Sequence, residues 1–283
     1  MIGVIGGSGV INMEELAGRQ ERRVATPFGK PSAPVICGEL AGVPVAFLPR
    51  HGRGHSIPPS SVNYRANIYA LKSLGATTVI GVNAVGGMKE EHAPCSLVVP
   101  DQLIDRTCKR ETSFFAEPGI VAHIAFSDPF CPEARAILTE QAGKLSLPFA
   151  GEGTYVCMEG PQFSTRAESN VYRSLGVDVI GMTAAPEAKL AREAELCYAN
   201  ICFVTDYDCW HTSAEPVSLE QVISNLLEGA ARAKRLLAAA LPKLAAVADC
   251  SCRHALDGAI ATDPGAITAK ARRRLALLLG GRP

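Results

Sequence analysis

Short apolar runs alternate along the chain with segments in which apolar residues recur every three or four positions. The short runs, rich in β-branched residues, predict strands, and the three- to four-residue repeat predicts helices. The predicted strands span residues 1–5, 43–48, 78–83, 97–99, 153–156, 177–182 and 196–205, and the predicted helices residues 62–74, 132–145, 165–175, 186–194 and 218–241. Because helices fall between several of the strands, the pattern predicts an α/β fold with a mostly parallel sheet covered by helices.

The composition changes after Pro242, where the chain becomes rich in alanine and basic residues. We therefore expect a main domain over residues 1–242 and a C-terminal extension over residues 243–283. The extension carries Cys250-Ser251-Cys252 and one last predicted helix over residues 266–279, and we expect it to pack on the same domain.

The bulk composition excludes several classes of partner. The chain has 283 residues, of which 47% are hydrophobic, enough for a well-formed core. Its 28 basic and 28 acidic residues cancel, so no net charge favours nucleic acid or an anionic membrane. The sequence shows neither a secretory signal nor an apolar run of transmembrane length, and we expect a cytoplasmic protein.

Ten cysteines are scattered along the chain, mostly within apolar stretches where a thiol behaves as a small hydrophobic group. Only Cys250 and Cys252 form a close pair, in a polar stretch followed by His254. A disulfide, a metal site and two free thiols are all open interpretations of this pair. We expect no metal, because recognisable spacing for four zinc ligands is absent.

Two carboxylates end the last predicted strand. Asp206 and Asp208 are two residues apart, so where the strand continues both side chains face the same side of the sheet. Two acids at the end of a buried strand suit a partner that offers a basic ring nitrogen to protonate and an amino group to bind, and adenine offers both. Burial of the pair would favour the neutral acid of at least one member.

Candidate anion-binding groups follow four of the strands. They are the glycine-rich Gly6-Gly7-Ser8-Gly9, the basic loop with Arg50 and His51, the segment Asn83-Ala84-Val85-Gly86-Gly87, and Met182-Thr183. Arginine forks onto two phosphate oxygens, histidine adds a donor, and the amides and hydroxyls of the other segments donate further bonds. The dinucleotide and nucleoside-triphosphate fingerprints are both absent, so the pattern favours a small anion such as inorganic phosphate.

Several motifs together resemble those of the purine nucleoside phosphorylase family, in particular its 5'-methylthioadenosine phosphorylase branch. They are TPFGKPS at 26–32, RHG at 50–52, VNYRAN at 62–67, EGPQFSTRAE at 159–168 and TDYDCW at 205–210, and the resemblance spans about residues 3 to 242. It implies the nucleoside phosphorylase fold, a single domain with a central mixed, mostly parallel twisted sheet flanked by helices. It also implies reversible phosphorolysis of 5'-methylthioadenosine to adenine and 5-methylthioribose 1-phosphate, with phosphate as co-substrate and without a metal or organic cofactor.

The resemblance further implies a role for individual residues. Asp206 would donate a proton to purine N7. The phosphate would be held by Ser8, Arg50, His51, Asn83, Ala84 and Thr183, and the nucleoside by Phe163, Ser164, Met182, Asp206, Tyr207, Asp208, Leu219, Val222, Ile223 and His123. His123 would come from a neighbouring subunit, so a homo-oligomer, a trimer or a hexamer, is expected.

Three alternatives to an adenine-releasing enzyme stay open. Asn83 and the Val85-Gly86-Gly87 segment resemble microbial branches, some of which act on 5'-methylthioinosine. A broad purine nucleoside phosphorylase would need a wider or more polar 5' pocket than Leu219 and Ile223 suggest. A non-catalytic nucleoside-binding or redox-sensing protein would use Cys250 and Cys252 as its switch.

Overall fold

The computed structural model describes residues 1–7, 16–211 and 219–282, and for residues 219–222 it describes the backbone alone. The strands are β1 Ile2–Gly6, β2 Ala17–Arg22, β3 Val35–Leu40, β4 Val43–Pro49, β5 Thr78–Gly87, β6 Leu97–Val98, β7 Gln102–Asp105, β8 Phe149–Ala150, β9 Thr154–Cys157, β10 Val179–Gly181 and β11 Cys197–Asp206. The α-helices are α1 Tyr64–Ser73, α2 Pro132–Lys144, α3 Arg166–Ser174, α4 Ala184–Glu193, α5 Leu219–Ala245 and α6 Ala269–Leu279. Short 3₁₀ helices are η1 Arg53–His55, η2 Pro59–Ser61, η3 Asp208–Trp210, η4 Ser251–His254 and η5 Pro264–Ala266.

The strands form one mixed sheet in which parallel pairs predominate. Its main path runs β2-β3-β4-β1-β5-β10-β9-β7, and β11 branches from β5 to carry β6 and β8. Parallel pairs join β1 to β4 and β5, β11 to β5, β10 and β7 to β9, and β6 to β8. Antiparallel pairs join β2 to β3, β3 to β4, β10 to β5 and β11 to β6. This confirms the predicted mixed, mostly parallel sheet.

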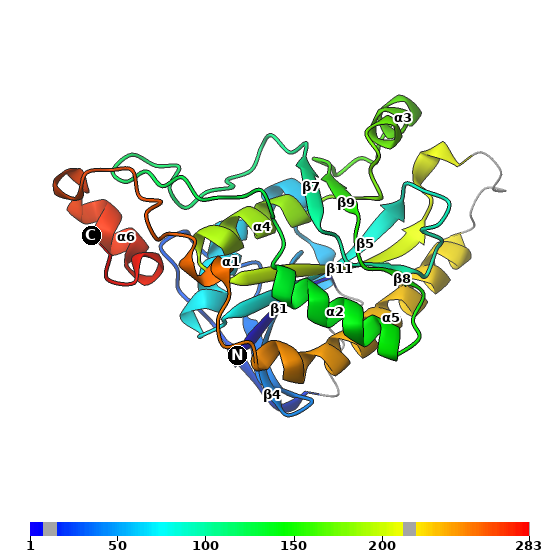
Figure 1. Ribbon diagram of the computed structural model, residues 1–283, viewed down its shortest axis with the longest axis horizontal. Coiled ribbons are helices and arrows are strands. Elements are labelled where there is room, and N and C mark those ends of the chain that lie inside the picture. The colour runs from blue at the N-terminus through cyan, green and yellow to red at the C-terminus, as the bar shows by residue number, and fades with distance from the viewer. Residues whose placement is uncertain (8–15, 212–218, 283) are drawn as a thin grey trace.

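Helices cover both faces of this sheet (Figure 1). Alternate residues of β11 pack on opposite faces of the sheet, because successive side chains of a strand point to opposite sides. Ala199 and Ile201 belong to the core beneath α2 and α5, whereas Tyr198 belongs to the core beneath α1, α4 and α6. The final helix packs into this second core through Leu275 and Leu278.

Four strands were not predicted from the sequence, and several element ends differ from the prediction. The missed strands are β2, β3, β7 and β8, and β2 is exposed along its whole length, so it shows no apolar pattern to detect. Strand β5 continues to Gly87 instead of ending at Asn83, and β10 is shorter than predicted. Helix α5 runs through Pro242 to Ala245, four residues beyond its predicted end at Leu241. The predicted start of this helix, at residue 218, lies outside the described residues.

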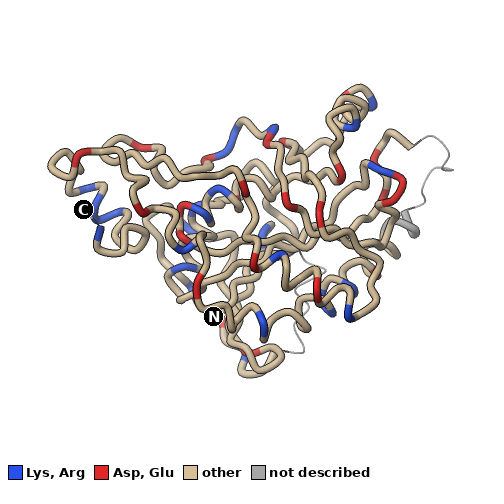
Figure 2. Tube along the Cα trace, in the orientation of Figure 1, with Lys and Arg blue, Asp and Glu red and all other residues tan. Residues whose placement is uncertain are grey.

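Charged residues of both signs are interspersed along the trace (Figure 2). The arginines of α6 illustrate this: Arg274 pairs with Glu117, and Arg272 donates to the carbonyl of Pro264. Among the helices of the described residues, none combines the length and the apolar character that spanning a bilayer requires.

Glu193, at the end of α4, predicts a pH dependence of stability. Burial raises its pKa to about 7, although the Phe114 amide and the Ser113 hydroxyl, which donate to the carboxyl, act in the opposite direction. A raised acid pKa means that folding favours the protonated form, so the free energy of unfolding falls as the pH rises from the ordinary value near 4.5 to about 7. The expected contribution is at most about 3 kcal/mol.

Glu193→Gln removes this titrating group and keeps an acceptor of similar size. Urea unfolding of both proteins at pH 5 and pH 8 should show that the variant loses less stability than the wild type as the pH rises. Equal losses in the two proteins would contradict the proposed role of Glu193.

Candidate active site

A cavity of about 410 Å³ lies at the carboxyl ends of the central parallel strands. Gly7 follows β1, Arg50 follows β4, Asn83 lies on β5 and Asp206 ends β11, and all four line the cavity. Loops at the carboxyl ends of parallel strands converge over a crevice, as expected from the sequence. The remaining lining residues are His51, His55, Pro59, Val82, Ala84, Val85, Gly86, Met158, Phe163, Ile180, Gly181, Met182, Thr183, Phe203, Thr205, Asp208 and Leu226.

The cavity opens where β5 changes its neighbour. β5 pairs with β1 up to Gly81 and joins β10 only at Gly86, so residues 82–85 keep one edge that neither strand covers. The Asn83–Gly87 segment, expected to be a loop at a strand end, is therefore the strand itself. Its polar backbone still reaches the cavity, because the sheet divides at this level and leaves carbonyl and amide groups for other partners.

Arg50 is buried in an ion pair that was not predicted from the sequence. Its Nε and Nη2 bond to the two carboxylate oxygens of Glu187 at 2.5 and 3.1 Å, and Glu187 is fully buried. Nη2 also reaches the Ile5 carbonyl, and Nη1 donates to the Val82 carbonyl. Burial alone would lower the pKa of Arg50, but the Glu187 carboxylate outweighs it and the net shift is upward. Arg50 thus forks onto Glu187, and Nη1, with one bond among the described residues, has a second N–H for an anion.

A hydrogen-bond network continues from this ion pair to the cavity. The Asn83 side-chain oxygen accepts from Arg50 and from Asn200 at 3.2 and 2.9 Å, while its nitrogen donates to the Thr183 hydroxyl at 2.5 Å. Tyr198 donates to Glu187 at 2.8 Å and accepts from Asn200. Since the Thr183 oxygen already accepts a bond, its hydroxyl hydrogen is free to be donated into the cavity.

Thr183 also precedes α4, and its side chain does not cap that helix. The start of a helix offers backbone amides and the positive end of the helix dipole, both of which favour an anion. The polar wall made by Arg50, Asn83, Thr183 and the start of α4 can therefore hold phosphate.

His51 lines the same wall in a fixed tautomer. Its Nδ1 lies 2.8 Å from the Ile57 carbonyl and must donate to it, and the ring stacks on His55. Burial lowers the pKa of His51 to about 4. The Arg50 charge also lowers this pKa, whereas the bond to the Ile57 carbonyl acts in the opposite direction. The neutral ring therefore presents Nε2 as an acceptor. That His51 donates to the anion stays a prediction; with Nδ1 donating to Ile57, the neutral ring suits a phosphate oxygen that carries a proton.

Asp206 and Asp208 both reach the cavity, but not along one continuous strand. β11 ends at Asp206 after a register shift, and Asp208 starts η3 with a left-handed φ of 52°. The Asp206 carboxylate accepts from the Asp208 amide at 2.9 Å and from the Thr205 hydroxyl at 2.7 Å, and the Ser169 hydroxyl donates to Asp208 at 2.6 Å. Burial raises the pKa of Asp208, and the Asp206 charge adds to it while Ser169 opposes it.

Gly86 makes room for the two acids. A Cβ at this position would lie 3.0 Å from Ile180 and within 3.3 and 3.4 Å of Asp208 and Asp206. The first two contacts are tighter than ordinary packing, so a side chain here would displace Ile180 or Asp208, and glycine lets β5 pass close beneath the carboxylates.

The opposite wall of the cavity is apolar. Met158, Phe163 and Met182 line it, and Phe163 is 82% exposed, so this side is open in the single chain. Arg110 holds the wall in place: its guanidinium bonds to the backbone carbonyls of Met182 and Glu159 and lies near Tyr64. Arg110 was not among the residues predicted from the sequence.

Several predicted site residues lie elsewhere or outside the description. Ser164 does not line the cavity, and its hydroxyl faces the Met158 sulfur. Tyr207, expected to bind substrate, turns away: its ring stacks on His211 and its hydroxyl donates to the Glu90 carbonyl. His123 is exposed outside this cavity, on a segment whose backbone bonds to Ala259. Ile223 is exposed on α5, and Leu226 of the same helix lines the cavity instead. Ser8 and the side chains of Leu219 and Val222 lie outside the described residues.

Comparison with known proteins places these features in a family. A model described as the phosphorylase superfamily matches residues 1–242. The S-methyl-5'-thioadenosine phosphorylase of Geobacter sulfurreducens is 51% identical over 280 residues, which cover 99% of this chain and 98% of that protein.

Solved structures agree in fold. A methylthioadenosine phosphorylase from an antarctic soil metagenomic library superposes with a TM-score of 0.92 at 45% identity and covers 98% of each chain. A variant of the adenosine/methylthioadenosine phosphorylase of Schistosoma mansoni, in complex with adenine, gives 0.81 at 35% identity and covers 99% of this chain and 97% of that one.

Proposed function

The chain belongs to the phosphorylase superfamily, and we propose that it catalyses the reversible phosphorolysis of 5'-methylthioadenosine to adenine and 5-methylthioribose 1-phosphate. One observation carries the proposal. Two carboxylates and a phosphate-suited wall face the same cavity from opposite ends of one stretch of β5, next to Gly86 and at Asn83. A nucleoside with phosphate beneath its sugar needs this arrangement.

In the forward reaction a phosphate oxygen forms a bond to the anomeric carbon of the sugar as the bond from that carbon to purine N9 breaks. The bonding pair leaves with the purine, whose developing negative charge makes it a poor leaving group. A proton delivered to N7 neutralises that charge, and general acids contribute in this way in many enzymes. Asp206 is the proposed donor, and Asp208 accepts from the exocyclic amine of adenine.

The phosphate is held by the wall built on the Arg50–Glu187 ion pair. The second N–H of Nη1, the Asn83 amide and the Thr183 hydroxyl donate to it, and Nε2 of His51 accepts from its protonated oxygen. Ser8 and Ala84 complete the proposed set. Because phosphate supplies the nucleophile and Asp206 the proton, we propose that the reaction uses no metal or organic cofactor.

The methylthio group is proposed to lie against the apolar residues of α5. Leu226 lines the cavity, and Ile223 and Leu227 on the same helix expose apolar surface nearby in sequence. Leu219 and Val222 would extend this surface, and His123 of a neighbouring subunit would complete it. We therefore propose a homo-oligomer, a trimer or a hexamer. We also propose that the protein is cytoplasmic.

Turnover of three nucleosides tests the proposed substrate. With phosphate in excess, 5'-methylthioadenosine is expected to give the highest kcat/KM, because a carboxylate at Asp208 accepts from an amino group and cannot accept from a 6-keto group. Adenosine should follow, since a relative is named for both adenosine and methylthioadenosine. Faster cleavage of 5'-methylthioinosine would favour the oxopurine alternative, and adenine binding without turnover would favour a binding protein.

A further inference from the structure

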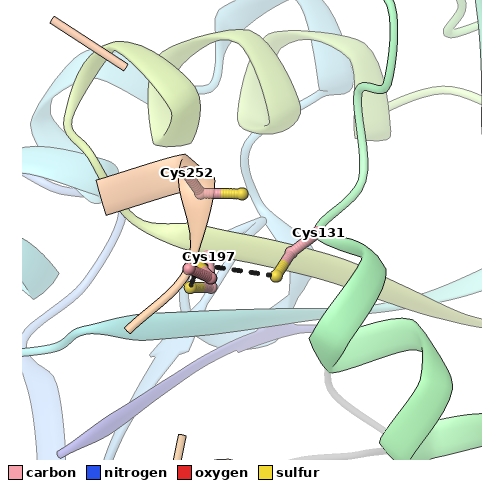
Figure 3. Close-up of side chains that lie close together, drawn as sticks. Cys131, Cys197 and Cys252 are labelled. Atoms are coloured by element: carbon pink, nitrogen blue, oxygen red, sulfur yellow. Dashed lines mark hydrogen bonds between the residues drawn. The ribbon is translucent and has the colours of Figure 1, made fainter. Parts of the chain in front are cut away.

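Four buried cysteines converge at the junction of the C-terminal extension with the main domain. Figure 3 shows three of them, Cys131, Cys197 and Cys252. Cys131 immediately precedes α2, Cys197 is the first residue of β11, and Cys250 and Cys252 lie at the start of η4. All four sulfur atoms lie within 4.8 Å of one another. None of these cysteines lines the cavity described above, so the cluster is separate from the proposed reaction.

The sulfur positions suit a tetrahedral ion. Zinc held by four thiolates has Zn–S bonds of about 2.3 Å, which separates neighbouring sulfurs by roughly 3.8 Å. The sulfurs of Cys131 and Cys250 are 3.9 Å apart, and those of Cys197 and Cys250 are 2.6 Å apart. An ion needs the close pair to open by about 1 Å and the other sulfurs to stay near their present positions.

Cys131 meets two further groups at this place. Cys131 stands at the start of the 13-residue helix α2 and does not cap it with its side chain, and a negative charge is stabilised at a helix start. The Glu133 carboxylate accepts from the Cys131 thiol at 3.3 Å, and Cys131 gives up this bond when its sulfur binds an ion.

We propose that Cys131, Cys197, Cys250 and Cys252 form a structural four-thiolate site for zinc. The ion joins the extension to α2 and β11, and the closed, buried donor set leaves no position for a reacting molecule. Disulfides are the competing arrangement for the same residues. A single Cys197–Cys250 bond would leave two thiols in the same pocket, whereas an ion uses four mutually close sulfurs together.

Metal analysis of the full chain tests the site. The protein is purified under reducing conditions without chelator, exposed to zinc and desalted, and about one zinc ion per chain is expected. Cobalt in place of zinc should give the sulfur-to-metal charge-transfer absorption and the visible bands of a tetrahedral thiolate site. Cys252→Ser and Cys131→Ser should lose the zinc and these bands, whereas the control Cys108→Ser, an exposed cysteine outside the cluster, should keep both.

Three results would overturn the proposal. One is reduced wild-type protein that binds neither metal. Another is zinc retained in Cys252→Ser, which would show that the zinc binds at another cluster, such as Glu91, His92 and Asp178. The last comes from a thiol titration of denatured protein that was not reduced. If four of the ten thiols are missing and no metal is bound, the cluster forms disulfides. The cobalt spectrum of the wild type distinguishes these outcomes even where a serine variant does not fold.

Discussion

Asp206→Asn is expected to lower kcat/KM for 5'-methylthioadenosine by roughly 10²- to 10⁴-fold, the range that a general acid contributes. The amide fits the same place: its oxygen can accept from the Asp208 amide, and its NH2 group, in the place of the other carboxylate oxygen, can donate to the Thr205 hydroxyl. It can donate a hydrogen bond to N7 but cannot transfer a proton. Initial rates of adenine release at saturating phosphate measure the loss.

The same variant should shift selectivity toward 6-oxopurines, since an amide tolerates a keto-bearing ring. The kcat/KM ratio of 5'-methylthioinosine to 5'-methylthioadenosine should therefore rise. Asp257→Asn is the matched control, because Asp257 is exposed and pairs with Arg282 away from the cavity. Wild-type rates and an unchanged ratio in Asp206→Asn would remove this residue from the mechanism.

Glu187→Gln should weaken both folding and phosphate binding. The change leaves the Arg50 guanidinium buried without its counter-charge, and breaking a buried ion pair from one side costs about 3–5 kcal/mol. Arg50 would also keep at most one of the two bonds to residue 187 that fix its orientation toward Val82 and Asn83, so KM for phosphate should rise more than KM for the nucleoside. Urea unfolding and steady-state kinetics measure the two effects.

Glu228→Gln is the control for that experiment. Glu228 pairs with Arg232 at 2.7 Å on the exposed side of α5, and such surface pairs contribute less than about 1 kcal/mol. If the two variants lose the same stability and share an unchanged KM for phosphate, Glu187 has no special part in holding Arg50.

Much of the architecture follows from local sequence. Buried strands such as β1, β4 and β11 are short apolar runs, and α1, α2 and α4 show the helical repeat, so the mixed, helix-covered sheet was predictable. Several candidate site residues were also predictable, because Arg50, Thr183 and Asp206 follow or end apolar segments and Asn83 is a polar residue within one.

The contacts that hold these residues were not predictable from local sequence. Glu187 reaches Arg50 from 137 positions away along the chain, and Arg110 reaches Met182 from 72. Asn200 and Glu187 did leave a signal, since each is a polar residue within an otherwise apolar strand or alanine-rich helix. The cysteine cluster left no such signal. The pair Cys250 and Cys252 was visible in the sequence, but its closeness to Cys131 and Cys197 was not, because only the fold brings these four together.

The division of the sheet at β5 fixes the scale of the substrate. Asn83 and Gly86 are three residues apart on one strand, and a strand rises about 3.3 Å per residue, so the two points are roughly 10 Å apart. The hydrogen-bonded ladder to β11 keeps this length constant. Attacking and departing groups are thereby aligned by a rigid backbone rather than by movable loops, and a molecule much shorter or longer than a nucleoside cannot engage both ends together.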